Sequence, residues 1–337
     1  MKNKDFLDMI AYGKIMHLLR KRPLDINIET YAFCPMKCVF CCNRKYDRKH
    51  SLMSIRLFEK IVKEYCNLFG GGALGIGAMQ SEFLSDPLLL ERIKVLKRYK
   101  KKLYVYSTTP LITCAKYTDK ELLDILKVFD YLEISVEGHN KETYFKMSGI
   151  NGFSTLENQL NRVERLLSEN RLNCYLKFAF RTYDKKELIS SRFYKDIVLQ
   201  HRNNIDIKDR FFTWFGSIKK EDLLPGANLI IKENTKERKN CAVPYATLAV
   251  QADGKVIGCG CIDWLEKYVI GDCRKQTLDN IWRSEKAWEF RNAFRKRNLP
   301  SICKECGLYV SSLDAFAQKK LRNYKPIEGV YYNIAER

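Results

Sequence analysis

Asp25-Ile-Asn-Ile-Glu-Thr-Tyr31 leads, after two residues, into Cys34-Pro-Met-Lys-Cys38-Val-Phe-Cys41. The first stretch alternates apolar and polar side chains, which is the pattern of a β-strand. The second stretch places three cysteines within eight residues, directly behind that strand. In α/β proteins, ligands bind in the loops at the carboxyl ends of the strands. We therefore expect these three thiols to form a functional site.

The strand pattern recurs along the chain, with helical periodicity between the repeats. The expected strands cover 25–31, 73–80, 102–107, 131–136, 173–180 and 208–214. The expected helices cover 54–68, 87–99, 119–128, 153–169 and 185–200. Strands that alternate with helices form a parallel sheet covered by helices, so the fold class is α/β. Six such strands predict a partial (β/α)6 TIM-like barrel.

The pattern changes beyond the charged stretch 232–239, which is typical of a linker. A hairpin is expected at 248–258, with Asp253-Gly254 as its turn, and a helix from about Leu278 to Arg297. These elements predict a small α+β domain behind the barrel. The expected divisions are an N-terminal helical extension at 1–24, a barrel core at 25–231, the small domain at 232–315 and a C-terminal tail at 316–337.

The composition is that of a globular protein, since 46% of the 337 residues are hydrophobic and 30% are charged. No run of about 18 uncharged apolar residues is present, so no membrane span is expected. The first residues, Met1-Lys-Asn-Lys-Asp5, lack the apolar segment of a signal peptide. We expect a cytoplasmic protein with no membrane partner.

The formal net charge of +20 raises the question of a nucleic-acid partner. The Lys and Arg residues are spread along the whole chain and no nucleic-acid-binding motif accompanies them, so nucleic acid is not the expected partner. A solvated basic surface is the simplest interpretation. The alternatives are an anionic small-molecule substrate and an acidic electron donor such as flavodoxin or ferredoxin.

Thirteen cysteines are present, and they gather at two places. In a cytoplasmic chain they indicate metal ligands or reactive thiols rather than disulfides. Three thiolates can hold three irons of a cubane and leave the fourth iron open. Cys42 is not expected to be a ligand, because neighbouring side chains in extended chain point in opposite directions. A zinc site is the alternative, for which His50 is the only nearby fourth ligand.

Cys34, Cys38 and Cys41 match the C-x3-C-x-aromatic-C signature of the radical S-adenosylmethionine (SAM) superfamily, with Phe40 as the aromatic residue. The resemblance implies that the open iron of a [4Fe–4S] cluster chelates the amino and carboxylate groups of SAM. It also implies that one electron cleaves SAM to methionine and a 5′-deoxyadenosyl radical, which abstracts a substrate hydrogen atom. The cofactor carries this chemistry, and the protein supplies orientation.

Further SAM contacts are implied by position in the family pattern. Glu82 stands in the place of a Gly-Gly-Glu-Pro-like segment after the second strand, and Ser135-Val-Glu-Gly138 matches a Ser-x-Asp/Glu-Gly segment after the fourth. Ser107-Thr-Thr109 and Arg181 end the third and fifth strands, where capping of the strand end is the alternative role. The SAM-binding residues implied in this way are Phe40, Glu82, Ser107, Ser135, Glu137 and Arg181.

The second cysteine group reads C-x12-G-x4-C, then C-x2-C after a gap of 43 residues. Its members are Cys241, Cys259, Cys303 and Cys306. Four thiolates complete a closed site, and zinc is an alternative occupant on spacing alone. Behind a radical SAM core, this arrangement resembles the SPASM and twitch domains, which carry auxiliary [4Fe–4S] clusters.

This second group departs from the full SPASM pattern, which continues with further cysteines. No cysteine follows Cys306, so the resemblance implies one auxiliary cluster, as in the twitch form. Cys261 and Cys273 are held in reserve, either as replacement ligands or as residues that face the substrate. Ordinary buried thiols are the alternative interpretation for both.

A single closed auxiliary cluster resembles that of the aminocyclitol dehydrogenase of aminoglycoside biosynthesis. The resemblance implies an oxidoreductase that modifies a sugar, an aminocyclitol or a sugar nucleotide, with the auxiliary cluster accepting an electron. Tyr106, Glu137, Arg181 and Trp214 are candidates to line the substrate pocket. No residue is nominated as a catalytic base.

Two other functions stay open. A maturase of ribosomally made peptides, which epimerises or crosslinks residues, often carries an N-terminal domain of about 80 residues that binds the leader. Only 33 residues precede Cys34, which argues against that interpretation. From a different class, the chain would be a non-enzymatic iron–sulfur or zinc protein.

Overall fold

The computed structural model describes most of the chain. The described residues are 20–46, 50–77, 81–201, 204–230, 241–259, 265–296 and 298–304, with residues 17, 263, 306, 307 and 309. The predicted N-terminal extension and C-terminal tail lie largely outside them. Among these residues, no helix is both long and apolar enough to cross a membrane.

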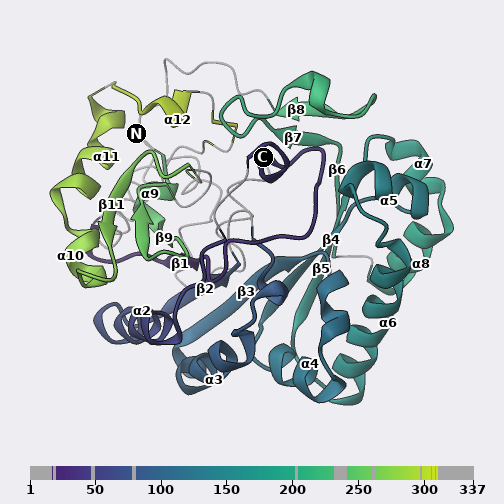
Figure 1. The fold of residues 1–337 in the computed structure, drawn as a ribbon, viewed down its shortest axis with the longest axis horizontal. Coiled ribbons are helices and arrows are strands. Elements are labelled where there is room, and N and C mark those ends of the chain that lie inside the picture. Colours follow the sequence, from purple (N-terminus) through teal and green to yellow (C-terminus); the bar gives the residue numbers. More distant parts are fainter. Residues whose placement is uncertain are drawn as a thin grey trace, which may run out of the picture.

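A curved nine-stranded sheet forms the centre of the molecule, in the order β11-β10-β9-β1-β2-β3-β4-β5-β6 (Figure 1). Strands β1 to β6 run parallel, as the alternation of strands and helices predicts. Their bounds are β1 (Asp25–Ile28), β2 (Gly72–Ile76), β3 (Leu103–Thr109), β4 (Tyr131–Val136), β5 (Tyr175–Arg181) and β6 (Ile205–Lys208). The fold is therefore α/β, with a partial barrel.

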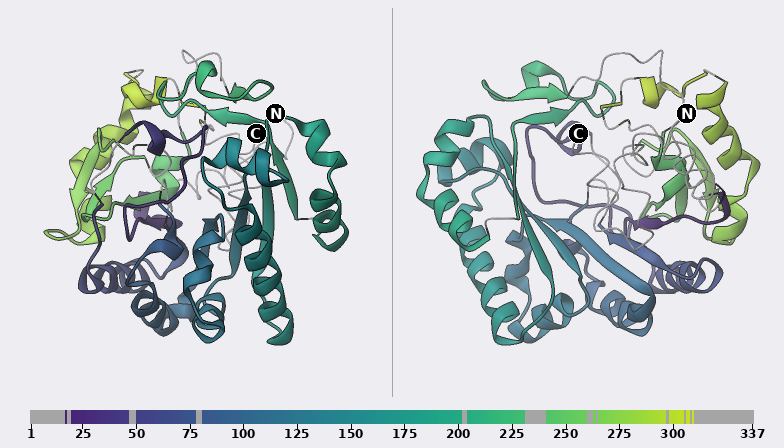
Figure 2. Two further views of the ribbon diagram at one scale, coloured as in Figure 1. Left: turned by 45° about the vertical axis from the view of Figure 1, so that its right-hand side comes forward. Right: turned by 180° about the vertical axis from the view of Figure 1, so that it is seen from behind.

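Helices cover the convex side of this sheet, and the concave side faces inward (Figure 1 and Figure 2). They are α2 (Ile55–Leu68), α3 (Leu89–Tyr99), α4 (Asp119–Leu126), α6 (Phe153–Glu169), α7 (Lys185–Ser190) and α8 (Arg192–His201). Helix α5 (Lys141–Ser148) lies instead beyond the carboxyl end of β4 and packs on α6. Short 3-10 helices are η1 (Cys42–Lys45), η2 (Phe83–Ser85), η3 (Lys100–Lys102), η4 (Ile112–Lys116) and η5 (Lys220–Asp222).

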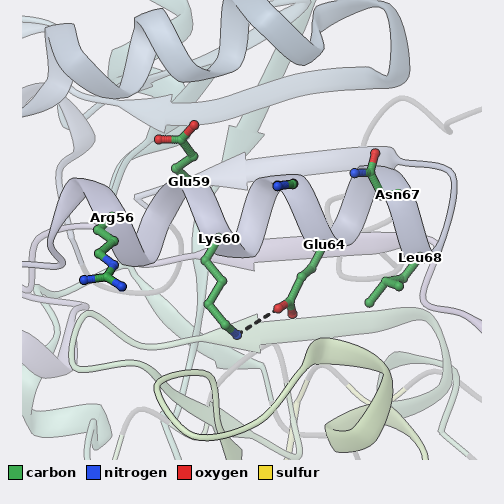
Figure 3. A pocket seen from close by; sticks show the side chains of 7 residues that line it. Arg56, Glu59, Lys60, Glu64, Asn67 and Leu68 are labelled. Carbon is green, nitrogen blue, oxygen red and sulfur yellow. Dashed lines mark ion pairs between the residues drawn. The ribbon is translucent and has the colours of Figure 1, made fainter.

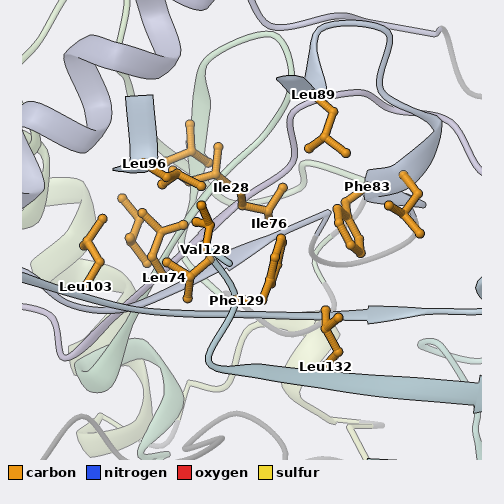
Figure 4. Close-up of a cluster of buried hydrophobic side chains, with 14 of the residues drawn as sticks. Ile28, Leu74, Ile76, Phe83, Leu89, Leu96, Leu103, Val128, Phe129 and Leu132 are labelled. Carbon is orange, nitrogen blue, oxygen red and sulfur yellow. The ribbon is translucent and has the colours of Figure 1, made fainter. Parts of the chain in front are cut away.

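The apolar core lies between the sheet and these helices (Figure 4). Alternate strand residues such as Ile28, Leu74 and Leu132 point into it and are buried. Each such side chain stabilises the fold by about 1.5–3 kcal/mol relative to exposure. The residues between them therefore face the concave side, where most are polar.

The structure differs from the sequence-based expectations at four places. The helix expected from about Leu278 to Arg297 is two helices, Leu278–Trp282 and Glu285–Arg295. Helix 185–200 is two helices, because the Ser191 hydroxyl ends α7 by donating to the Leu188 carbonyl and begins α8 by accepting from the Tyr194 amide. Helix α5 was not predicted. The strand predicted at 208–214 is also wrong in its pairing: β6 ends at Lys208, and β7 (Arg210–Phe212) pairs with β8 (Asn228–Ile230) in a separate sheet.

The region beyond residue 240 extends the main sheet. Its elements are α9 (Val243–Ala246), β9 (Thr247–Val250), β10 (Lys255–Ile257), β11 (Val269–Asp272), α10 (Leu278–Trp282), α11 (Glu285–Arg295) and α12 (Ser301–Lys304). The predicted hairpin is confirmed as β9–β10, and its Gly254 has a φ of +91°, which glycine adopts without strain. Strand β9 pairs in parallel with β1, so both predicted domains share one sheet.

Two side chains of α2 hold this region against the barrel (Figure 3). The Lys60 ammonium donates to the carbonyls of Cys273 and Gln276, each at 2.8 Å. The Glu64 carboxylate accepts from the Leu278 amide at 2.8 Å, at the first residue of α10, and pairs with Lys60 at 2.9 Å. These contacts line one side of an open surface pocket on α2.

Replacing Lys60 with alanine is expected to lower the free energy of unfolding by about 1–2 kcal/mol, because two hydrogen bonds between the regions are lost. Urea unfolding of the anaerobically purified protein measures this. Lys63→Ala is the matched control, since Lys63 lies on the same helix and is exposed. Its effect should stay within about 0.5 kcal/mol. Equal losses in both variants would contradict the assigned role of Lys60.

Candidate functional site

The loop that carries Cys34, Cys38 and Cys41 follows β1 and is fixed by the end of α5. The Lys37 and Val39 amides donate to the carbonyls of Ser148 and Met147, each at 2.9 Å. Carbonyls in the last turn of a helix lack partners within the helix, so they are available for this loop. Helix α5 ends at Gly149, where a Cβ would lie 3.0 Å from the Lys37 carbonyl oxygen. The helix missed from the sequence therefore positions the cysteine loop.

Phe40 is held from the opposite side by aromatic residues of the segment 210–214. Its ring stacks on Phe211 with centroids 4.7 Å apart, and the Trp214 indole donates to the Phe40 carbonyl at 2.9 Å. The Arg181 guanidinium lies 5.7 Å from the centroid of the same ring. The segment 208–214, predicted as the sixth barrel strand, thus packs against the cysteine loop.

Arg92 fixes both ends of the loop at its base. Its side chain is completely buried on α3, and its Nε atom donates to Asp86 at 2.6 Å. Its Nη2 atom lies 2.5 Å from the Met53 carbonyl oxygen and 3.4 Å from that of Thr30. Thr30 lies two residues beyond β1, before the cysteines, and Met53 lies two residues before α2. One guanidinium therefore spans the entrance and the exit of the loop.

The three thiols lie within electrostatic reach of one another and of buried carboxylates. Burial raises the pKa of the Cys34 and Cys38 thiols, and the nearby Glu82 and Glu137 carboxylates raise it further. The pKa of Cys41 is lowered, chiefly because the Cys42 side chain is hydrogen-bonded to it. A cation among these thiols would stabilise their thiolate forms.

The donor set of this loop fits an iron–sulfur cluster, because three thiolates can hold three irons of a cubane. A single zinc ion binds each sulfur at about 2.3 Å, which requires the ligands to converge on one point. Among the described residues, no three His, Cys, Asp or Glu side chains do so. His50, the predicted fourth zinc ligand, packs instead with its ring centroid 4.9 Å from that of Phe33. A cubane takes each cysteine on a different iron, so its ligands lie farther apart.

Glu82 lies beside the cysteine loop, because its amide donates to the Phe33 carbonyl at 2.9 Å. The carboxylate accepts from the hydroxyls of Thr109 and Thr113 at 2.8 and 3.1 Å. Desolvation outweighs these hydrogen bonds and raises the pKa of Glu82 to about 7. A cationic partner would stabilise the ionised form of a buried carboxylate of this kind.

Ser135, Glu137 and Arg181 meet at the carboxyl ends of β4 and β5. The Ser135 hydroxyl donates to Glu137 Oε1 and accepts from Arg181 Nη1. Glu137 Oε2 is buried and has no hydrogen-bond partner in the described part of the chain. Burial raises the pKa of Glu137, although Arg181 lies 3.9 Å away. Gly138 is required behind it, since a Cβ there would lie 2.5 Å from the Tyr144 amide nitrogen.

The remaining predicted residues of the barrel lie apart from this group. Ser107 shares the convex face of β3 with Val105, and its hydroxyl donates to the Ile76 carbonyl at 2.6 Å. That contact is the strand-end role named as its alternative. Tyr106 lies deeper on the concave face, and its hydroxyl donates to Asp25.

The second cysteine group is carried by segments that gather around α11. The Tyr245 hydroxyl of α9 donates to the Arg291 carbonyl at 3.4 Å, and Gly258 packs so closely that a Cβ would lie 2.9 Å from the Phe290 ring. The Ser301 amide, at the start of α12, donates to the Tyr268 hydroxyl at 2.8 Å. The cysteines on or beside these segments are Cys241, Cys259 and Cys303, which are buried, and Cys306, which is partly buried.

Of Cys261 and Cys273, the two cysteines proposed as replacement ligands or substrate-facing residues, the structure describes only Cys273. Cys261 lies outside the described residues. Cys273 is completely buried, and burial raises its pKa to about 12. Its amide donates to the Gly254 carbonyl and its own carbonyl accepts from Lys60. Cys273 therefore occupies the contact between α2 and the hairpin.

Comparisons with known protein families agree with this division. The family model of the radical SAM superfamily matches residues 28–182, which include the first cysteine group. The model of the SPASM iron–sulfur cluster-binding domain matches residues 241–307, which include the second. No curated protein matches the sequence.

Solved structures share the fold at low sequence identity. BtrN in complex with AdoMet and 2-DOIA has a TM-score of 0.55 and 17% identity, and the match covers 85% of this chain and 93% of that one. Native anSMEcpe with bound AdoMet has a TM-score of 0.57 and 14% identity, over 90% and 96% of the two chains. The complex of anSMEcpe with AdoMet and the Cp18Cys peptide has a TM-score of 0.55 at the same identity and coverage.

Proposed function

Because the chain belongs to the radical SAM superfamily and carries a C-terminal SPASM domain, we propose that it uses SAM to oxidise or otherwise modify a small polar substrate. Cys34, Cys38 and Cys41 are the proposed ligands of the SAM-binding [4Fe–4S] cluster. The observation that carries this proposal is the fixed cysteine loop beside the buried carboxylates Glu82 and Glu137.

When bound, the cluster and SAM supply a 5′-deoxyadenosyl radical that removes a hydrogen atom from the substrate. The residues of the chain hold and orient SAM. Glu82 is the proposed acceptor for its amino group, since a cation there compensates the buried charge. Ser135, Glu137 and Arg181 are the proposed partners of its ribose and carboxylate. Phe40, fixed by Phe211 and Trp214, packs beside them.

The second cysteine group is the proposed site of one auxiliary [4Fe–4S] cluster, with Cys241, Cys259, Cys303 and Cys306 as ligands. Such a cluster supplies an acceptor for one electron, because its potential is tunable over a wide range. Oxidation of a substrate C–H group then balances as one hydrogen atom taken by the radical, one electron taken by the acceptor and one proton released. A flavodoxin or ferredoxin is the proposed donor of the first electron.

The proposed substrates are sugars, aminocyclitols and sugar nucleotides. BtrN, whose complex holds AdoMet and 2-DOIA, matches this chain over nearly its whole length, which favours a small-molecule substrate of that kind. The second candidate is a peptide, and the complex of anSMEcpe with a peptide favours it. The concave face of the sheet is rich in buried polar and charged side chains, which supports the first candidate.

Turnover of SAM distinguishes the two candidates. The reconstituted protein, with SAM and dithionite, is expected to form 5′-deoxyadenosine in amounts that rise when an aminocyclitol or amino sugar is added, together with an oxidised product. Mass spectrometry detects both. A protein that modifies cysteine-containing peptides and leaves every sugar-type compound unchanged would support the peptide candidate instead. Zinc without sulfide in the purified protein would contradict both.

A further inference from the structure

The concave face of β3, β4 and β5 is built in layers, because the strands pair in register. Tyr106, Tyr131 and Tyr175 oppose one another and form a deep layer. The rings of Tyr131 and Tyr175 stack with centroids 5.7 Å apart. The Tyr106 hydroxyl donates to Asp25 on β1, and its ring crosses Gly75, where a Cβ would lie 2.9 Å from it. Tyr106 and Tyr131 are therefore buried in this layer, whereas Tyr175 at its edge remains 40% exposed.

The next layer towards the cysteine loop holds Thr108, Glu133 and Lys177, which also oppose one another in register. The flanking residues Leu132 and Ile134 lie in the convex core, so Glu133 points to the concave side. None of the three side chains in this layer is aromatic, in contrast to the layer below. Neighbouring strands lie about 4.7–4.9 Å apart, so the opposed residues Thr108 and Glu133 can bind one group together.

Glu133 is completely buried, yet its charge is compensated on one side only. Its Oε1 atom lies 3.4 Å from Arg181 Nη2 and 3.9 Å from the Lys208 ammonium. Its Oε2 atom has no hydrogen-bond partner within the described ranges, and the same holds for Thr108 Oγ1. An unsatisfied buried polar atom costs about 1–3 kcal/mol, and more when it is charged. Two such atoms on opposed residues indicate a place where a polar group binds.

This pair lies below the proposed SAM contacts and is joined to them by Arg181, whose Nη1 atom donates to Ser135 and whose Nη2 atom lies 3.4 Å from Glu133 Oε1. Strands rise about 3.3 Å per residue, so Glu133 lies roughly 7 Å deeper than Ser135 and 13 Å deeper than Glu137. Neighbouring side chains on β5 and β6 connect the layer to solvent, since Lys177, Asp206 and Lys208 keep 17, 30 and 24% of their side-chain surface exposed.

We propose that Glu133 Oε2 and Thr108 Oγ1 bind a hydrogen-bond donor of the substrate, either a hydroxyl or a protonated amine. This inference rests on the proposed function and names the chemistry that the substrate must present. A carboxylate oxygen only accepts hydrogen bonds, so a carbonyl or ether oxygen is rejected at Glu133 Oε2, whereas the Thr108 hydroxyl can both accept from the bound donor and donate to a neighbouring oxygen. A hydroxylated or aminated ring satisfies both atoms, and a ring without the donor leaves Glu133 unpaired.

Binding of glucosamine and glucose to the reconstituted protein with SAM tests this proposal. Ligand-observed NMR gives the dissociation constants. Glu133→Gln keeps the shape of the side chain and removes its charge, and it is expected to weaken glucosamine binding by at least about tenfold. Asp206→Asn is the charge-matched control, since Asp206 pairs with the same Lys208, and its effect should stay within about twofold. Iron content and the unfolding midpoint show whether each variant folds.

The two sugars identify the donor. If Glu133→Gln weakens the binding of glucosamine alone, the donor that Glu133 binds is the ammonium group. If it weakens the binding of both sugars, the donor is a hydroxyl group. If neither sugar binds the wild-type protein, or if Glu133→Gln and Asp206→Asn act alike, the assignment is wrong. Should Glu133→Gln fail to fold, Thr108→Val is measured against the same criteria. Formation of 5′-deoxyadenosine from SAM without any sugar reports on the proposed function alone, so a failure there is distinguished from a failure of the Glu133 assignment.

Discussion

Alanine in place of Cys34 is expected to abolish cleavage of SAM. Two thiolates do not hold a cubane in place, and the released loop no longer orients SAM against Glu82. Loss of a residue that hydrogen-bonds to a metal ligand typically lowers metal affinity or activity 10–100-fold. Loss of a ligand itself should therefore lower the rate of SAM cleavage by more than about 100-fold. The measurement is 5′-deoxyadenosine formed per chain with dithionite as the reductant. Bound iron should fall from about eight to about four atoms per chain, since a [4Fe–4S] cluster is lost.

Two variants separate this effect from general damage. Cys303→Ala should also lower iron to about four atoms but retain cleavage of SAM, because it removes a proposed ligand of the auxiliary cluster. Cys114→Ala removes a buried thiol of η4 that belongs to neither cysteine group, so iron and cleavage should both persist. Cleavage that survives in Cys34→Ala would refute the assignment of the first cluster. Cleavage that is lost in Cys303→Ala would show that the two sites are not independent.

The sequence predicts those features that depend on local pattern. The strand at 131–136 is confirmed at both ends, because apolar and polar residues alternate there and Gly138 follows. The hairpin turn at Asp253-Gly254 is confirmed for a similar reason, since the glycine takes a positive φ. Cysteine spacing likewise predicts both cluster regions, and the two family matches bear this out.

Features that depend on distant contacts were missed. Helix α5 is short, and its last carbonyls find their partners in the cysteine loop about 110 residues earlier. One local signal was present, because Asn140 and Thr143 form a capping box at its start. The pairing of β9 with β1 joins Asp25 to Thr247, and no local pattern specifies a partner so distant in sequence.

The role of Arg92 was also missed, although the sequence holds a signal for it. Arg92 falls on the apolar stripe of α3, between Leu89, Ile93 and Leu96. A charged residue on the buried face of an amphipathic helix requires an opposite charge and further hydrogen-bond acceptors. Asp86 supplies the charge. The acceptors, the Thr30 and Met53 carbonyls, come from the two ends of a loop that only the tertiary structure brings to α3.

Arg92→Met is therefore expected to impair both stability and the first cluster. Removing one partner of a completely buried ion pair leaves Asp86 with the Leu88 amide but without the Arg92 guanidinium, and such a loss costs about 3–5 kcal/mol. The change also removes the guanidinium hydrogen bonds to the Thr30 and Met53 carbonyls. The two ends of the loop then keep only their direct backbone hydrogen bonds, such as that from the Met53 amide to the Thr30 carbonyl at 2.9 Å. Bound iron should fall towards about four atoms per chain, the content of one cluster. Urea unfolding and iron analysis of the anaerobic protein measure the two effects.

A second substitution separates stability from positioning. In the double variant Arg92→Met and Asp86→Leu, no unpaired charge remains, and replacing a buried ion pair by apolar side chains is often neutral or stabilising. The free energy of unfolding should therefore recover. Iron and SAM cleavage should stay low, because neither new side chain binds the Thr30 and Met53 carbonyls. If the double variant regains its iron together with its stability, Arg92 serves the fold alone and has no separate role in holding the cysteine loop.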